Sequence, residues 1–140
     1  MNSGGPNYAP AAGAYDHGAT VRKNNVNACQ FFVNLGGGVG IRSVQTANNS
    51  IGSSSHYFLE GWIDQAAGQI RCSINGGPPA STAVTNFGLA SPIGRVALGK
   101  RVDTNSDFFE GRIYEVGAAK TWSPAAQTAL RQYFHGYYGL

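Results

Sequence analysis

The stretch HYFLEGWIDQAAGQIRCSINGGPPAST, residues 56–82, decides the fold that we predict for this chain. Alternating side chains occur on both sides of a short turn, with Tyr57, Leu59 and Gly61 before it and Ile70, Cys72 and Ile74 after it. Successive side chains of a strand point to opposite faces, so this pattern predicts a β-hairpin. Asn75 and Gly76 suit positive φ angles, and two prolines follow, which indicates a second turn with residues 80–84 as the return strand.

Upstream of this hairpin, the sequence predicts two further strands. CQFFVNL, residues 29–35, and VGIRSVQTA, residues 39–47, are β-favouring runs separated by three glycines. Residues 1–27 are rich in glycine, proline, alanine and asparagine without a period, which is typical of an extended N-terminal arm. We therefore predict an arm over 1–27 and one domain over 28–140.

Downstream, RVALGKR, residues 95–101, is predicted as a strand, and residues 107–122 as a strand or strand pair. In the latter we expect Phe109, Ile113 and Val116 to face the core. Ser123 followed by Pro124 is typical of a helix start, and helical spacing relates the apolar side chains after it, namely Ala126, Leu130, Phe134 and Tyr137. The predicted fold is all-β: a two-sheet antiparallel jelly-roll sandwich with a short C-terminal helix.

Composition excludes several classes of protein. The formal charge is +3 and the ten lysines and arginines are scattered, so no basic stripe suggests nucleic-acid binding. No apolar run is long enough to span a bilayer, and the N-terminus lacks the pattern of a signal peptide. Cys29 and Cys72 each lie in an alternating apolar stretch, and we interpret them as small buried side chains in strands. A functional thiol and a disulfide, within or between chains, remain open alternatives.

Three segments together resemble a known superfamily. They are YFLEGWIDQAAGQIRCSINGGPPA, VALGKRVDTNSDFFEGRIYEVGAAKTW and SPAAQTALRQYFHGYYGL, within residues 56–140. This part of the chain resembles the concanavalin A-like lectin/glucanase superfamily, in particular its laminin-G-like and pentraxin-like modules of bacterial, secreted and phage proteins. The resemblance implies a jelly-roll fold, and it suggests carbohydrate as a ligand and calcium as an ion to look for.

The spacing of the acidic residues argues against catalysis. Glycoside hydrolysis needs two carboxylates facing one bond, whereas Glu110 and Glu115 are five residues apart and point to opposite faces of a regular strand. Asp107 and Glu115 share a face but lie more than about 25 Å apart along an extended strand. The chain also has no G-x-S-x-G motif. We therefore predict no catalytic residues, with a glycan hydrolase only as a remote alternative.

Two kinds of ligand site are compatible with the sequence. The loop DTNSD offers oxygen ligands for calcium from Asp103, Asn105 and Asp107, and the alternative is a polar turn that uses these side chains for local hydrogen bonds. A sugar site would place exposed aromatic rings beside polar side chains, and the candidates are Trp62, Tyr114, Asn105 and Arg101. The alternative for the two aromatic residues is the core.

These observations favour a non-enzymatic structural or attachment module. We expect a virion protein, such as a capsid decoration or tail fibre protein of a phage, that forms homo-oligomers and contacts other virion or surface proteins. Tyr137 and Tyr138 are candidates to cover a neighbouring subunit or a sheet edge. The alternative is a secreted or cell-surface carbohydrate-binding lectin module, so the expected location is a virion or the extracellular space.

Overall fold

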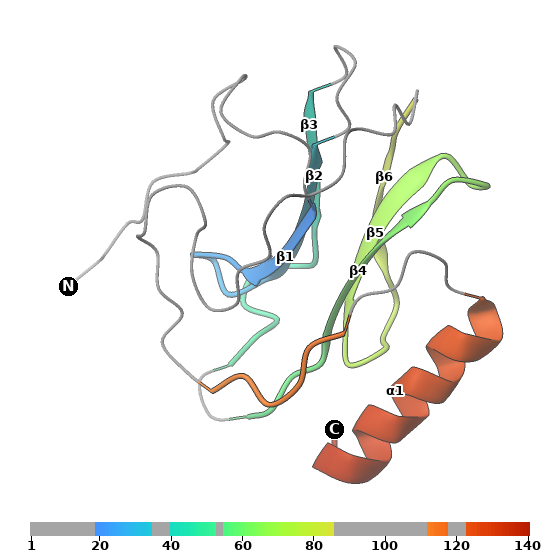
Figure 1. Ribbon diagram of the computed structural model, residues 1–140. Coiled ribbons are helices and arrows are strands. Elements are labelled where there is room, and N and C mark those ends of the chain that lie inside the picture. Colours follow the sequence, from blue (N-terminus) through green and yellow to red (C-terminus); the bar gives the residue numbers. More distant parts are fainter. Residues whose placement is uncertain (1–18, 35–39, 53–54, 86–111, 118–122) are drawn as a thin grey trace.

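A computed structural model describes residues 19–34, 40–52, 55–85, 112–117 and 123–140. They form two antiparallel three-stranded sheets that face each other and one helix on the outside of the second sheet (Figure 1). The first sheet contains β1 (Ala19–Lys23), β2 (Cys29–Asn34) and β3 (Ile41–Gln45), and the second contains β4 (Leu59–Asp64), β5 (Gln69–Ile74) and β6 (Ala80–Ala83). The helix α1 spans Pro124–Tyr138.

The two antiparallel sheets and the C-terminal helix that the sequence predicts are confirmed. In each sheet the described strands pair with their neighbours in the sequence, in the orders β1-β2-β3 and β4-β5-β6. A jelly roll requires connections that return a strand beside a more distant one. Such connections are not found among these six strands, so the structure establishes a two-sheet arrangement and not the jelly-roll topology.

The predicted hairpins form with the expected turns. Leu59 pairs with Ile74 and Asp64 with Gln69, so β4 and β5 are joined by a short turn. Asn75 and Gly76 have φ angles of 51° and 66°, which lets the chain reverse into β6. Strands β2 and β3 also pair antiparallel, as the glycine-separated runs predict.

Strand β1 lies inside residues 1–27, the segment that the sequence assigns to an arm. Val21 pairs with Phe31 and Lys23 with Cys29, so β1 is the edge strand beside β2. Most of its side chains are exposed. An edge strand of this kind is ordered by backbone pairing and contributes little apolar surface, which explains why the sequence pattern did not reveal it.

The core fills the space between the sheets. Its buried side chains come from both sheets and from the segments that follow β3 and β6: Cys29, Phe31, Val33, Val44, Ile51, Ile70, Cys72 and Val84. Strands β2 and β3 face β5, and β1 faces β4. The inward alternation of Ile70, Cys72 and Ile74 is therefore confirmed.

The segment 112–117 differs from its prediction. It is not a strand in the structure, and all six of its residues are exposed. Ile113 and Val116 were predicted to face the core, but their exposed fractions are 47% and 59%, so that prediction is wrong. The segment instead contacts two other parts of the chain. Tyr114 contacts His56 in the loop before β4, and Glu115 accepts a hydrogen bond from Tyr133 of α1. Phe109 and the predicted strand 95–101 lie outside the described residues.

Helix α1 begins where the sequence predicts, at Ser123 and Pro124. The Ser123 hydroxyl accepts a hydrogen bond from the Ala126 N–H at 3.1 Å, Pro124 is the first helical residue, and Gly139 ends the helix with a φ of 67°. No helix in the described part of the chain has the length and apolar character needed to cross a bilayer.

The packed face of α1 is rotated relative to its prediction. Leu130 and Phe134 are half-buried as expected, but Ala126 and Tyr137 are exposed, with Tyr137 at 69%. Gln127, Arg131 and His135 lie on the packed face instead. Polar partners on the sheet explain this rotation.

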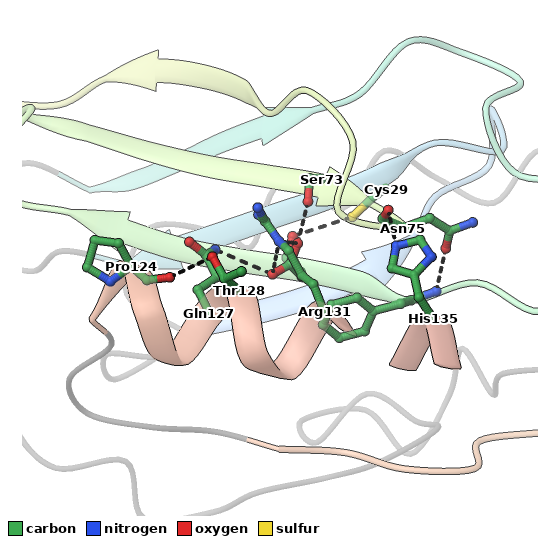
Figure 2. Close-up of polar contacts among 10 residues, drawn as sticks. Cys29, Ser73, Asn75, Pro124, Gln127, Thr128, Arg131 and His135 are labelled. Carbon is green, nitrogen blue, oxygen red and sulfur yellow. Dashed lines mark hydrogen bonds and ion pairs between the residues drawn. The ribbon is translucent and has the colours of Figure 1, made fainter. Parts of the chain in front are cut away.

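The principal polar partner is Glu60, whose side chain is nearly buried on the outer face of β4. The Nε atom of Arg131 donates to both Glu60 oxygens, at 3.1 and 3.0 Å. Ser73 on β5 donates to the same carboxylate at 2.6 Å, and the Gln127 amide approaches it at 3.4 Å. Figure 2 shows Gln127 and Arg131 pointing from α1 toward the sheet and Ser73. This carboxylate therefore fixes the position of α1.

Replacing Ser123 with alanine is expected to lower the free energy of unfolding by about 1 kcal/mol, because the Ala126 N–H loses its acceptor. Urea unfolding followed by circular dichroism measures the change. Gly136→Ala is the control of opposite sign: a Cβ at Gly136 meets nothing within 4 Å, and alanine favours a helix interior by about 1 kcal/mol over glycine. Equal stability of the two variants would contradict the cap assignment.

Candidate functional site

A hollow opens beside the C-terminal end of α1, where the helix end meets the loops on either side of the β4–β5 hairpin. Its volume is about 520 Å³. The lining residues come from the loop before β4, the turn after β5 and the end of the chain: Ser55, His56, Tyr57, Asn75, Tyr138, Gly139 and Leu140. A hollow of this size falls within the range of small-molecule sites.

Asn75 organises the floor of the hollow. Its backbone N–H donates to the Phe58 carbonyl and its side-chain oxygen accepts from the Phe58 N–H, both at 2.8 Å. These bonds tie the turn after β5 to the chain entering β4. The Asn75 carbonyl oxygen faces Nε2 of His135 at 2.9 Å, so the same turn also contacts α1 (Figure 2).

The end of the helix is fixed in the same region. The Gly139 N–H donates to the His135 carbonyl at 3.0 Å, which closes the last turn. The other ring nitrogen of His135, Nδ1, contacts the Leu140 oxygen. Phe134 stacks on Phe58 with ring centroids 4.3 Å apart. The wall formed by the last residues is therefore held by polar contacts and ring packing.

Aromatic rings border one side of the hollow. The rings of Tyr114 and His56 meet edge to face with centroids 5.2 Å apart. The ring centroids of Tyr114 and Tyr138 are 5.7 Å apart. Nε2 of His56 is 3.3 Å from the Tyr114 hydroxyl. Tyr114 is 54% exposed, so much of this residue remains open to solvent. The rings offer apolar faces, and Ser55, His56 and Asn75 offer hydrogen-bonding groups beside them.

The carboxylate of Glu115 contacts a tyrosine of α1 next to these aromatic rings. The Tyr133 hydroxyl donates to Glu115 at 2.9 Å. This hydrogen bond raises the pKa of Tyr133, and desolvation, with the Glu115 charge as the next cause, raises the pKa of Tyr138. Both tyrosines therefore carry neutral hydroxyl groups at physiological pH.

The predicted ligand residues are only partly brought together. Tyr114 borders the hollow through His56 and Tyr138. Trp62 lies on β4 without lining the hollow, half-buried, with the Arg131 guanidinium 5.8 Å from its ring centroid. The other predicted ligand residues, Arg101 and Asn105, and the calcium candidates Asp103, Asn105 and Asp107 lie outside the described residues.

Within the described residues, His, Cys, Asp and Glu side chains do not gather in threes that could hold a metal ion. Glu60, Asp64 and Glu115 are the acidic residues in this part of the chain, and each has a partner. Glu60 binds Arg131, Asp64 pairs with Arg71 at 3.2 Å, and Glu115 accepts from Tyr133. The described geometry thus offers a binding surface of rings and neutral polar groups.

Sequence reasoning missed His56 and Asn75 as site residues. In the sequence His56 lies beside aromatic residues, which suggests a strand-edge residue, and Asn75 is predicted as a turn residue. The turn prediction for Asn75 was right, but no local pattern shows that this turn meets the end of a helix 60 residues later. The concentration of aromatic residues in YFHGYYGL was the available signal for Tyr138.

Comparisons with known proteins found no matching protein family, curated protein or solved structure. The likeness to the concanavalin A-like superfamily therefore stays a prediction based on the quoted segments.

Proposed function

We propose that this chain is a non-enzymatic attachment module that holds a sugar residue of a surface glycan in the hollow beside the end of α1. The observation that carries the proposal is the arrangement of Tyr114 and Tyr138 next to His56, Asn75 and Ser55. Sugars present apolar C–H faces together with hydroxyl groups. A surface that combines ring faces with neutral donors and acceptors matches both features.

The hollow suits a neutral ligand. None of the described residues that line it is a lysine, arginine, aspartate or glutamate. Asn75 already uses its side-chain oxygen on the Phe58 N–H, which leaves its amide N–H groups to donate to a ligand. Ser55 is exposed and supplies a hydroxyl.

The wider setting that we propose is a jelly-roll domain of the concanavalin A-like type on a virion, such as a phage capsid decoration or tail fibre protein, with a homo-oligomer as its assembled form. The two facing sheets and the quoted segments support the fold assignment. The exposed rings of Tyr133 and Tyr137 support contacts with neighbouring subunits or surface proteins. A secreted or cell-surface lectin module would use the same hollow.

Replacing Tyr138 with alanine is expected to weaken glycan binding about tenfold or more, because one ring face beside the hollow is lost. The experiment is a glycan array with the wild-type chain, followed by calorimetry with the best-bound glycan and the variant. Tyr137→Ala is the matched control, because Tyr137 is a tyrosine of the same helix that does not line the hollow. Absence of binding by the wild type, or an equal loss in both variants, would contradict the proposal.

A further inference from the structure

The two cysteines meet at the centre of the sandwich. Cys29 lies on β2 and Cys72 on β5, each the middle strand of its sheet. They are 43 residues apart in the sequence, and both are fully buried free thiols. They are the only cysteines of the chain.

Both side chains reach across the space between the sheets. The Cys29 thiol points to the Glu60 carbonyl of the second sheet at 3.9 Å. The Cys72 thiol points to the carbonyls of Cys29 and Val44 in the first sheet, at 3.5 and 3.6 Å. Facing sheets usually lie about 10 Å apart, yet Cα atoms of β2 and β5 approach within 8 Å. A disulfide needs a still closer approach of the two residues, with Cα atoms about 4.4–6.8 Å apart, and the contact of the Cys72 sulfur with the Cys29 carbonyl is the observation that brings these two residues together.

Two other uses of a thiol pair do not fit this environment. A zinc site needs about four ligands, and the described residues contain no group of three candidate ligands. A reactive thiol needs exposure and a low pKa, whereas both sulfurs are fully buried. The hydrogen bond between the two thiols, together with burial, raises the pKa of Cys29, and the same hydrogen bond lowers the pKa of Cys72. In the folded protein, therefore, Cys29 is a poor nucleophile that solvent does not reach.

We propose that Cys29 and Cys72 are a modification site, at which an intramolecular disulfide ties the two sheets together when the chain folds in an oxidising environment. The oxidant is a small-molecule disulfide. One cysteine thiolate attacks it, which forms a mixed disulfide and releases one small thiol. The second cysteine thiolate then attacks the mixed disulfide, which forms the Cys29–Cys72 bond and releases the second small thiol. The two protein thiols are oxidised, the reagent is reduced, and both thiol protons pass to water or to the released thiolates.

Burial determines when this reaction takes place. In the closed sandwich neither sulfur is accessible, so exchange must precede the packing of β2 against β5 or follow its opening. The folded reduced protein is therefore expected to resist the oxidant, whereas the refolding chain is expected to react. The bond would close a loop of the chain from Cys29 to Cys72, which contains β3, β4 and most of β2 and β5.

The test is refolding of the reduced, denatured chain with a mixture of oxidised and reduced glutathione. Intact mass is expected to fall by the mass of two hydrogen atoms, and a thiol-reactive chromophore in denaturant is expected to detect no thiol. Peptide mapping is expected to join the peptides of Cys29 and Cys72. The melting temperature of this form is expected to exceed that of the reduced form by roughly 10 °C, since a loop of this length is closed.

The double variant Cys29→Ala/Cys72→Ala is the control, because its melting temperature is expected not to respond to reductant. Two free thiols after refolding, glutathione retained on either cysteine, or dimers linked through cysteine would each overturn the proposal. The mass measurement uses only the wild-type chain, so it decides the question even where a variant does not fold. None of these results depends on glycan binding.

Discussion

Gly61→Val is expected to lower the free energy of unfolding by about 3 kcal/mol, because the two sheets leave no room for a side chain at this position of β4. A Cβ at Gly61 would lie 2.5 Å from Cδ2 of Phe31 and 2.7 Å from Cγ2 of Val21. Both side chains belong to the first sheet, and Phe31 is buried in the core. The strands must therefore move apart, or the Phe31 ring must leave its position.

Urea unfolding of the purified variant measures this cost. Gly117→Val is the matched control, because a Cβ there meets nothing within 4 Å and the backbone has no positive φ. It is expected to change stability by less than about 0.5 kcal/mol. The double variant Gly61→Ala/Val21→Ala is expected to be more stable than the sum of its single changes predicts, since removing the Val21 methyl groups makes space. A cost at Gly61 no larger than at Gly117 would contradict the close packing of β1 and β2 on β4.

The sequence predicted the parts of the fold in which local pattern and burial agree. The alternation in β4 and β5, the turn at Asn75 and Gly76, and the cap at Ser123 each depend on neighbouring residues, and the structure confirms them. The sequence did not show why Gly61 is glycine. That reason is a contact with Phe31, 30 residues earlier in the chain and in the other sheet.

The predictions that the structure contradicts share one physical cause, which is contact between segments that are distant in the sequence. Ile113 and Val116 have the composition of a strand, but their segment passes over α1 and stays exposed. Tyr137 has the spacing of a core residue, yet Glu60 attracts Arg131 and so rotates a different face of the helix toward the sheet. Of the candidate site, Tyr114 was identified from the sequence, whereas its proximity to His56 required the fold.

The second large effect is expected at the contact between α1 and the sheet. Arg131→Met is expected to cost about 3 kcal/mol of unfolding free energy, because methionine keeps much of the side-chain stem but leaves the Glu60 carboxylate without its cation. Glu60 is only 9% exposed, so water compensates little for the lost partner. Ser73 and Gln127 would remain as its hydrogen-bonding partners, at 2.6 and 3.4 Å.

Asp64→Asn is the control for this change. Asp64 pairs with Arg71 on the same sheet, but its side chain and that of Arg71 are 29% and 28% exposed. Solvent screens a pair of this kind, so its loss is expected to cost less than about 1 kcal/mol. Asparagine also keeps the oxygen that accepts from the Ala67 N–H, so the turn after β4 is retained.

The double variant Glu60→Gln/Arg131→Met distinguishes a buried charge from lost packing. Removing the carboxylate together with the guanidinium leaves no uncompensated charge, so the double variant is expected to be more stable than Arg131→Met alone. If it is no more stable, the cost comes from the contact of Arg131 with Trp62 and not from its ion pair. Because α1 carries Tyr138, Arg131→Met is also expected to weaken glycan binding under conditions where the sheets stay folded. Unchanged binding in a destabilised Arg131→Met chain would show that the end of the helix keeps its place through His135 and Phe134 alone.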